Sequence, residues 1–406
     1  MSPLNKIVQL SYFRLSVSLL ICILFFSSCL TQKIITPSEI EVIVTEDEKN
    51  KVDESEIETD PIFLKAREIA ASLDKRHLTA QIIISGIDGR GRVSPDTKAL
   101  LKGIPAGGIM FFAHNLNTDN NSIRTFISEA NAVIKDETNI SPFIAVDHEG
   151  GTVFRFGRGV TTLPGASTYY NKFQKDGRDA ALEKIEEDSF SSGKEIKALG
   201  FNMNFAPVAE YIVNENRRFL SSRSYGPDPV FTAEAATAFY NGMKKAGILC
   251  VVKHFPGNAG PDPHHSLSVL NTDKQTLNKY IYPFTVLIGH GARAIMVAHT
   301  SVPAIDNNIA TFSPVVMQNW LRGELGFNGL LISDDLLMAA VGKLKADEAA
   351  VLSVIAGMDM VLIWPQDLRR THNALLAALE NGKLPKERLL DAATRVIYEK
   401  LRIGLI

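Results

Sequence analysis

The stretch Ile248-Leu249-Cys250-Val251-Val252, followed directly by Lys253-His254-Phe255-Pro256-Gly257, is the segment that bears most on the fold. Continuous apolar sequence without polar alternation is typical of a strand that is buried on both faces, as in a parallel sheet. A lysine and a histidine follow where this strand would end, and a loop rich in proline and glycine comes next. Parallel α/β enzymes place their reactive side chains at such positions, so the segment predicts a buried strand with a site at its carboxyl end.

The loop after this strand carries Asp262-Pro263-His264-His265. A carboxylate two residues before an imidazole can orient the ring and stabilise its protonated form, so Asp262 and His264 are candidates for a proton-transfer pair. The alternative is a surface turn with solvated histidines, and the loop alone does not decide between the two.

Similar apolar runs recur along the chain and are separated by amphipathic segments of helical length. The eight runs cover residues 81–84, 108–112, 143–146, 201–205, 248–252, 294–297, 329–332 and 358–362. Helices are expected at 182–199, 232–247 (opening on Thr232), 277–289, 314–325, 346–356, 371–381 and 386–401. This alternation predicts an α/β fold, a (β/α)8 TIM barrel that forms one catalytic domain. A doubly wound sheet is the alternative, but no glycine-rich nucleotide loop follows the first run.

Composition limits the possible partners. The chain has 406 residues and a formal net charge of -2, with no block of basic residues, so a nucleic-acid partner is not expected. It has three cysteines, Cys22, Cys29 and Cys250, whose number and spacing fit neither a disulfide framework nor a cysteine-based zinc site.

The N-terminus has the pattern of a targeting segment. Lys6 and Arg14 precede an apolar run at residues 15–26, which is shorter than the roughly 20 residues needed to span a bilayer. The run ends in Phe26-Ser27-Ser28-Cys29, which resembles a bacterial lipobox whose cysteine receives lipid. A plain signal peptide or an uncleaved signal anchor is the alternative.

This pattern predicts three regions. Residues 1–29 are a lipoprotein signal peptide that ends at Cys29, residues 30–61 an acidic disordered tether without aromatic residues, and residues 62–406 the barrel domain. We therefore expect a protein outside the cytoplasm that is anchored to a bacterial membrane by lipid, on the periplasmic or the surface face.

Polar and charged side chains follow five of the predicted strands, at the end of the barrel where active sites lie. They are Asp147, His148, Glu149 and Arg155, then Asn204 and Glu210, then Lys253 and His254, then His299, and finally Ser333, Asp334 and Asp335. Any one of them could be a helix cap or a structural ion pair, but so many at one end of the barrel predict a site.

The residue types favour glycosidic chemistry. Carboxylates and cations can hold a hydroxyl-rich substrate, and glycoside cleavage needs one nucleophilic or basic carboxylate and one acid. The histidines could instead bind a divalent metal with the acids, but no His-x-His follows the first strand. We expect no metal and no cofactor.

Five ordered segments at the predicted strand ends carry a recognisable pattern: Asp147-His148-Glu149-Gly150-Gly151, Asn204-Phe205-Ala206-Pro207-Val208, Lys253-His254-Phe255-Pro256-Gly257, Ala298-His299 and Ser333-Asp334-Asp335-Leu336-Leu337-Met338. Together they resemble glycoside hydrolase family 3, and within it the bacterial β-N-acetylhexosaminidases that release N-acetylglucosamine from cell-wall fragments. The resemblance runs from about residue 73 to the C-terminus, and it implies a retaining exo-β-N-acetylglucosaminidase that acts on peptidoglycan-derived glycans or muropeptides.

The resemblance also implies roles for individual residues. Asp334 is the expected nucleophile, and His264 is the expected general acid/base with Asp262 as its partner. The residues expected to bind the sugar are Asp147, Arg155, Arg223, Lys253, His254 and His299. A β-glucosidase, a non-catalytic glycan-binding lipoprotein and phosphate as the acceptor in place of water are alternatives that stay open.

The loop after the fifth strand departs from the family pattern. The family usually has Lys-His-Phe-Pro-Gly-His-Gly and a longer run before Asp-Ser-His. Here Asn258 replaces the histidine, Pro263 replaces the serine, and the loop is shorter. His264 keeps an acid two residues before it, but His265 is an alternative acid/base. Glu210 stands where the family commonly has aspartate, and Thr152 stands where it has arginine.

Overall fold

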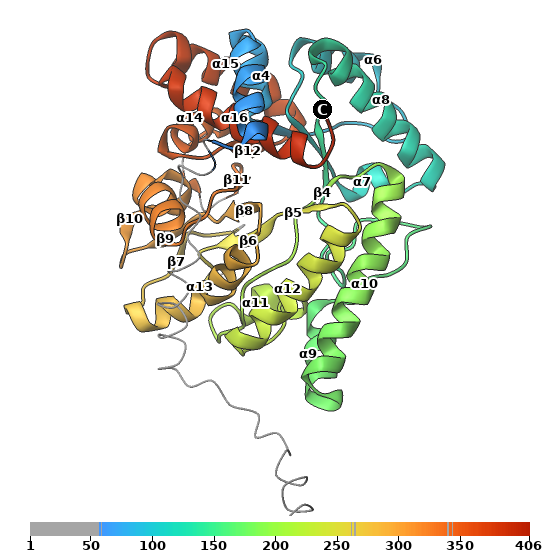
Figure 1. The fold of residues 1–406 in the computed structure, drawn as a ribbon, viewed down its shortest axis with the longest axis vertical. Helices are drawn as coiled ribbons and strands as arrows, with labels where there is room; N and C mark the ends of the chain where they lie inside the picture. Colours follow the sequence, from blue (N-terminus) through green and yellow to red (C-terminus); the bar gives the residue numbers. More distant parts are fainter. Residues whose placement is uncertain (1–56, 58, 261, 264, 339–340, 343) are drawn as a thin grey trace, which may run out of the picture. The chain divides into compact units, whose positions relative to one another are not determined.

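The computed structural model describes residues 57, 59–260, 262–263, 265–338, 341–342 and 344–406 (Figure 1). All of them belong to one compact unit, which spans Lys49–Ile406. The predicted signal peptide, Cys29 and most of the predicted tether lie outside the described residues. Within the described part of the chain, no helix is both long and apolar enough to cross a membrane.

Each of the eight apolar runs contributes to one parallel sheet. Its strands are β1 (Ile83–Gly86), β2 (Gly108–Phe111), β3 (Phe143–Val146), β4 (Met203–Asn204), β5 (Leu249–Cys250), β6 (Val252–Phe255), β8 (Ala294–Val297), β11 (Leu330–Asp335) and β12 (Met360–Ile363). Their order is β5-β4-β3-β2-β1-β12-β11-β8-β6. Only Val251 separates β5 from β6, so the two ends of the sheet belong to one strand of the chain and the sheet closes. The predicted TIM barrel is confirmed.

Burial on both faces explains why the strands contain continuous apolar runs. Along β3, Phe143 and Ala145 face the barrel interior with Met203 and Ile332, whereas Ile144 and Val146 join the outer core against the helices. The first strand begins two residues later than expected, because Gln81 ends helix α5 (Lys75–Gln81).

Helices surround the barrel (Figure 1). The main ones are α4 (Pro61–Ser72), α6 (Pro95–Gly103), α8 (Asn120–Thr138), α9 (Ala166–Asp176), α10 (Arg178–Leu199), α12 (Pro229–Lys245), α13 (Lys274–Gly289), η4 (Val315–Glu324), α14 (Ala346–Ala356), α15 (Leu368–Glu380) and α16 (Lys386–Arg402). The expected start at Thr232 is wrong, since α12 begins at Pro229 and is capped by Asp228, whose carboxylate accepts from the Val230 N–H at 2.9 Å. The helix expected at 314–325 is a π-helix.

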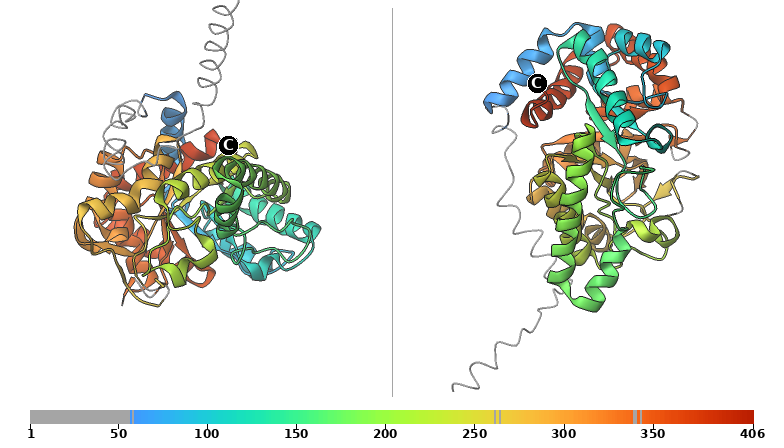
Figure 2. Two further views of the ribbon diagram at one scale, coloured as in Figure 1. Left: turned by 90° about the horizontal axis from the view of Figure 1, so that it is seen from below. Right: turned by 90° about the vertical axis from the view of Figure 1, so that its right-hand side faces the viewer.

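Helix α4 packs along α16, so the first and last described helices lie side by side (Figures 1 and 2). The Tyr398 hydroxyl donates to the carboxylate of Asp60, the cap of α4, at 2.6 Å, and Phe63 packs edge-on against the Tyr398 ring. These contacts attach the start of the domain to its end.

A second, three-stranded sheet was not expected. It consists of β7 (Ser268–Val269), β9 (Thr300–Val302) and β10 (Asp306–Ile309) in the order β10-β9-β7. Strand β7 ends the loop after β6, and β9 follows β8, so this sheet joins two loops at the carboxyl end of the barrel. It holds the far end of the loop that carries Asp262.

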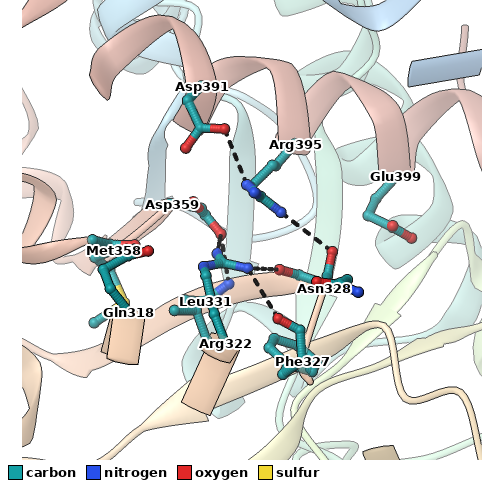
Figure 3. A network of polar contacts seen from close by, with 12 residues as sticks. Gln318, Arg322, Phe327, Asn328, Leu331, Met358, Asp359, Asp391, Arg395 and Glu399 are labelled. Carbon is teal, nitrogen blue, oxygen red and sulfur yellow. Dashed lines mark hydrogen bonds and ion pairs between the residues drawn. The ribbon is translucent and has the colours of Figure 1, made fainter. Parts of the chain in front are cut away.

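A buried ion-pair network joins strands and helices at the amino end of β12 (Figure 3). Asp359 is fully buried; it pairs with Arg322 of η4 at 2.6 Å and with Arg388 of α16 at 2.9 Å, and it accepts from the Leu331 N–H at 2.9 Å. Burial lowers the pKa of Arg322 to about 10, so this side chain stays charged at neutral pH. Asp359 therefore compensates two cations.

We expect Asp359→Asn to lower the free energy of unfolding by about 3–5 kcal/mol, because it removes the ion-pair partner of the buried Arg322 and leaves Arg388 with Asp391 alone. Urea denaturation followed by circular dichroism measures this change. Glu68→Gln is the control: it removes an exposed pair with Lys65 and should leave the midpoint unchanged. Equal midpoints for the two variants would contradict a stabilising role for the network.

Candidate active site

A cavity of about 490 Å³ opens at the carboxyl ends of the barrel strands. Its polar lining includes Asp147, Glu149, Arg155, Arg223, Lys253, His254, Asp334 and Asp335. The structure thus brings six of the nine residues predicted for catalysis or sugar binding to one cavity. Asp147, Arg155 and Arg223 come from segments after β3 and β4, and Lys253, His254 and Asp334 lie in β6 and β11.

Lys253 lies at the centre of the charged part of this lining. Only 3% of the residue is exposed, and its Nζ is 2.8 Å from Asp147 Oδ1 and 2.7 Å from Glu149 Oε1. Burial favours the neutral amine, but the two carboxylates outweigh it and raise the pKa of Lys253. The lysine is therefore a permanent cation whose position two acids determine.

The two acids also bind the two predicted arginines. Arg223 contacts both oxygens of Glu149, at 2.8 and 2.9 Å, and Arg155 lies 3.3 Å from Asp147. The Arg155 Nε is buried and has no hydrogen-bond partner among the described residues.

Glu149 was among the polar residues expected at this end of the barrel, but no role in catalysis or sugar binding was predicted for it. Burial opposes its ionisation, yet Lys253 and Arg223 hold its pKa well below the usual range. Its position inside the Asp-x-Glu-Gly-Gly motif was the available signal, but its partners come from loops that lie far away in the sequence.

Asp334 stands near the end of β11, with its carboxylate in the cavity. Burial opposes ionisation, but the imidazoles of His254 and His299 and the Asp335 N–H, which donates to Oδ1 at 2.8 Å, lower its pKa. A charged, partly exposed carboxylate of this kind is suited to nucleophilic attack.

The neighbouring acid is in a different environment. Burial raises the pKa of Asp335, whose carboxylate accepts from the Trp364 indole N–H at 2.6 Å and from the Leu337 N–H at 3.0 Å. The sequence left open whether one of these two aspartates caps a following helix. Asp335 binds a backbone N–H in a turn, and Asp334 faces the cavity.

His254 and His299 occupy different positions. The ring of His254 lines the cavity, and its Nδ1 is 2.5 Å from Glu210 Oε1. His299 is fully buried and is absent from the described lining: its Nδ1 lies 2.8 Å from Thr311 Oγ1 and its Nε2 3.0 Å from the Asp335 carbonyl. Burial lowers the pKa of His299.

An aromatic wall completes the cavity, and sequence reasoning missed it. Phe112 and Trp364 stack with ring centroids 4.6 Å apart and an angle of 2° between planes, and His114 continues the stack beyond Phe112 at 6.0 Å. All three line the cavity. Aromatic faces of this kind accept apolar faces of ligands. The sequence signal that could have indicated this wall was a tryptophan, Trp364, directly after the last strand.

The predicted acid/base loop is described only in part. His264 lies outside the described residues. The backbone carbonyl of Asp262 accepts from the N–H of His265 at 2.9 Å. The next residue, Pro263, lines the cavity. His265 itself is exposed. Among the described residues, no group of three or more histidine, cysteine or acidic side chains is placed to hold a metal ion.

The family model "Glycosyl hydrolase family 3 N terminal domain" matches residues 73–398. The chain belongs to glycoside hydrolase family 3. It is a glycoside hydrolase, and the resemblance inferred from its motifs is confirmed.

Relatives and solved structures of family 3 are consistent with this assignment. The β-hexosaminidase of Methylococcus capsulatus is 33% identical over 295 residues, which cover 71% of this chain and 84% of that protein. A family 3 β-N-acetylglucosaminidase from Paenibacillus sp. is 31% identical, with a TM-score of 0.77 over 82% of this chain and 63% of that one. NagZ from Neisseria gonorrhoeae, solved with N-trifluoroacetyl-D-glucosamine, is 30% identical, with a TM-score of 0.67 over 78% of this chain and 89% of that one.

The Glu149 pKa gives a prediction about stability. Its pKa in the folded state lies below the ordinary value of 4.5, so Glu149 contributes stability that is present above about pH 4.5 and is lost as the pH falls below it. Glu149→Gln should therefore melt at a lower temperature than the parent protein at pH 7, and this difference should shrink below pH 4.5, where Glu149 of the unfolded chain takes up a proton that the folded protein does not bind.

Thermal melts between pH 3.5 and pH 7 measure this difference. Glu187→Gln is the control, because Glu187 pairs with Lys184 on the surface and should show no such pH dependence. A difference between parent and Glu149→Gln that stays constant over the whole pH range would exclude the ionised Glu149 as its source.

Proposed function

We propose that the protein is a retaining exo-β-N-acetylglucosaminidase that hydrolyses terminal N-acetylglucosamine from peptidoglycan-derived glycans. The observation that carries the proposal is the Asp334 carboxylate, whose pKa is lowered and which shares its cavity with the ion pairs around Lys253. The printed names of its relatives, β-hexosaminidase and β-N-acetylglucosaminidase, support the choice of sugar.

The proposed reaction is a double displacement. The Asp334 carboxylate attacks the anomeric carbon, and His264 protonates the oxygen of the leaving group as the glycosidic bond breaks. His264, now neutral, then takes a proton from water, and the resulting hydroxyl displaces Asp334 from the anomeric carbon. Two inversions retain the anomeric configuration, and Asp262 orients the histidine in both steps.

The charged lining supports sugar binding. Asp147, Arg155 and Lys253 offer acceptors and donors whose positions are held by ion pairs, and Arg223 is held by both oxygens of Glu149. Groups fixed in this way lose little entropy when they bind hydroxyls. The stack of Phe112 and Trp364 supports a place for the apolar face of a sugar or aglycone.

Removal of the nucleophile gives the first test. Asp334→Ala should lower kcat/KM for 4-nitrophenyl N-acetyl-β-glucosaminide by roughly 10³-fold or more, because no covalent intermediate can form. Release of 4-nitrophenol measures the rate, and proton NMR shows the anomer that forms first. A well-folded parent protein with no turnover on any N-acetylhexosaminide would sink the proposal, and faster turnover of glucosides would indicate a β-glucosidase.

The same assay identifies the acid/base and the acceptor. His264→Ala should retain more activity on 4-nitrophenyl than on alkyl glycosides, since a good leaving group needs little protonation, and His265→Ala should behave like the parent. The reverse result would assign the role to His265. Sugar 1-phosphate formed only when phosphate is added would indicate phosphorolysis in place of hydrolysis.

We further propose that Cys29 carries lipid and anchors the protein outside the cytoplasm. The short apolar run and the Phe26-Ser27-Ser28-Cys29 segment support this. Cys29→Ser should move the protein from the membrane fraction to the soluble fraction and abolish labelling by an alkyne fatty acid, whereas Cys22→Ser should do neither, because Cys22 leaves with the signal peptide. Continued labelling of Cys29→Ser would contradict lipidation at this residue.

A further inference from the structure

Glu210 is a buried carboxylate at which contacts from one loop converge. Its side chain is 2% exposed, and it accepts from the His254 N–H at 3.3 Å and from the Asn258 N–H at 2.7 Å. The His254 Nδ1 and the Asn258 Nδ2 also contact it, at 2.5 and 3.0 Å. Two of these contacts come from His254 in β6 and two from Asn258 in the turn after it, so a residue from the β4 loop holds the base of the loop that carries Asp262.

Asn258 has a defined orientation in this arrangement. A carboxylate can only accept, so the amide NH2 of Asn258 must face Glu210. Its Oδ1 then accepts from the Thr300 hydroxyl at 2.9 Å, and its carbonyl accepts from Asn216 Nδ2 at 2.9 Å. Asn258 is 1% exposed, so its polar atoms are satisfied within the protein. An aspartate here would place a second carboxylate against Glu210.

The Glu210 carboxylate also determines that Nδ1 is the ring nitrogen of His254 that carries a proton toward it. With Glu210 accepting at Nδ1, that nitrogen carries a proton, and Nε2 is the ring nitrogen that remains to contact a ligand. The ring lines the cavity that contains Asp334. The orientation of His254 therefore affects both sugar binding and the charge next to the nucleophile.

Both residues depart from the family pattern, and they do so in complementary ways. The family pattern that the motifs resemble has aspartate at position 210 and histidine at position 258. Glutamate is longer than aspartate by one methylene, about 1.5 Å, and asparagine is shorter than histidine, so the longer acid meets the shorter partner.

We propose that Glu210 and Asn258 are a matched pair of positioning residues that hold the His254 ring in the active-site cavity. Neither residue is among the described lining of the cavity, so both act through His254. The functional part of this inference rests on the proposed glycosidase activity, but the state of the His254 ring is measurable without it.

A double-mutant cycle tests the match. Glu210→Asp should leave a gap next to His254, and Asn258→His should crowd the longer glutamate, so each single variant should lower kcat/KM by about 10²-fold. The double variant Glu210→Asp/Asn258→His restores the complementary lengths and should recover to within about tenfold of the parent. A loss in the double variant equal to the product of the two single losses would refute the match.

Glu399→Asp is the matched control. Glu399 is as buried as Glu210, with 2% of its side chain exposed, and it pairs with Arg293 away from the cavity. Shortening it should lower the melting temperature but leave kcat/KM of the folded enzyme unchanged. A comparable loss of kcat/KM in Glu399→Asp would mean that any shortened buried acid gives this result, and it would overturn the specific role of Glu210.

The ring itself provides a readout that is independent of activity. In ¹⁵N-histidine spectra, with the His254 signals assigned by their absence in His254→Gln, the parent should show a protonated Nδ1. Each single variant should shift these signals, and the double variant should restore them. Signals that do not change in the single variants would refute the positioning role, whereas a parent with these signals but no glycosidase activity would refute only the proposed function.

Discussion

The ion pairs of Lys253 are the constraint on which the mouth of the barrel depends. An ammonium group that is 3% exposed must be compensated, because an unpaired charge in the interior is strongly destabilising. Asp147 and Glu149 supply this compensation across the barrel mouth from the loop after β3, and each also binds an arginine. Several side chains that could hold a sugar are thereby placed before any ligand binds.

Burial and neighbouring charges, more than residue type, separate the roles of the acids at this end of the barrel. Asp334 and Asp335 are adjacent in the sequence, yet imidazoles lower the pKa of the first while burial raises that of the second. Glu149 stays ionised because it meets two cations, and Glu210 meets a histidine and an amide. Such a separation of carboxylates is how one site can combine nucleophilic attack with fixed binding groups.

The barrel itself was predictable, because its strands contain continuous apolar runs that are buried on both faces. Local signals were weaker at the element ends: Asp228 followed by Pro229 caps α12, where Thr232 had been expected to begin it. The sheet of β7, β9 and β10 was missed because its strands are short and come from two loops. The motifs identified the family, since five ordered segments at strand ends are specific even though each one is weak.

The sequence by itself determined the barrel, the end of it that carries the polar residues, and the candidates Asp147, Lys253, His254 and Asp334, because these depend on periodicity and on residue type at strand ends. Only the tertiary structure decided which side chains meet. It placed Glu149 between Lys253 and Arg223, placed Glu210 against Asn258, buried His299 behind the cavity, and stacked Trp364 on Phe112. The physical reason is distance along the chain: Lys253 and Asp147 are 106 residues apart, and no local pattern specifies a contact that forms only when the barrel closes.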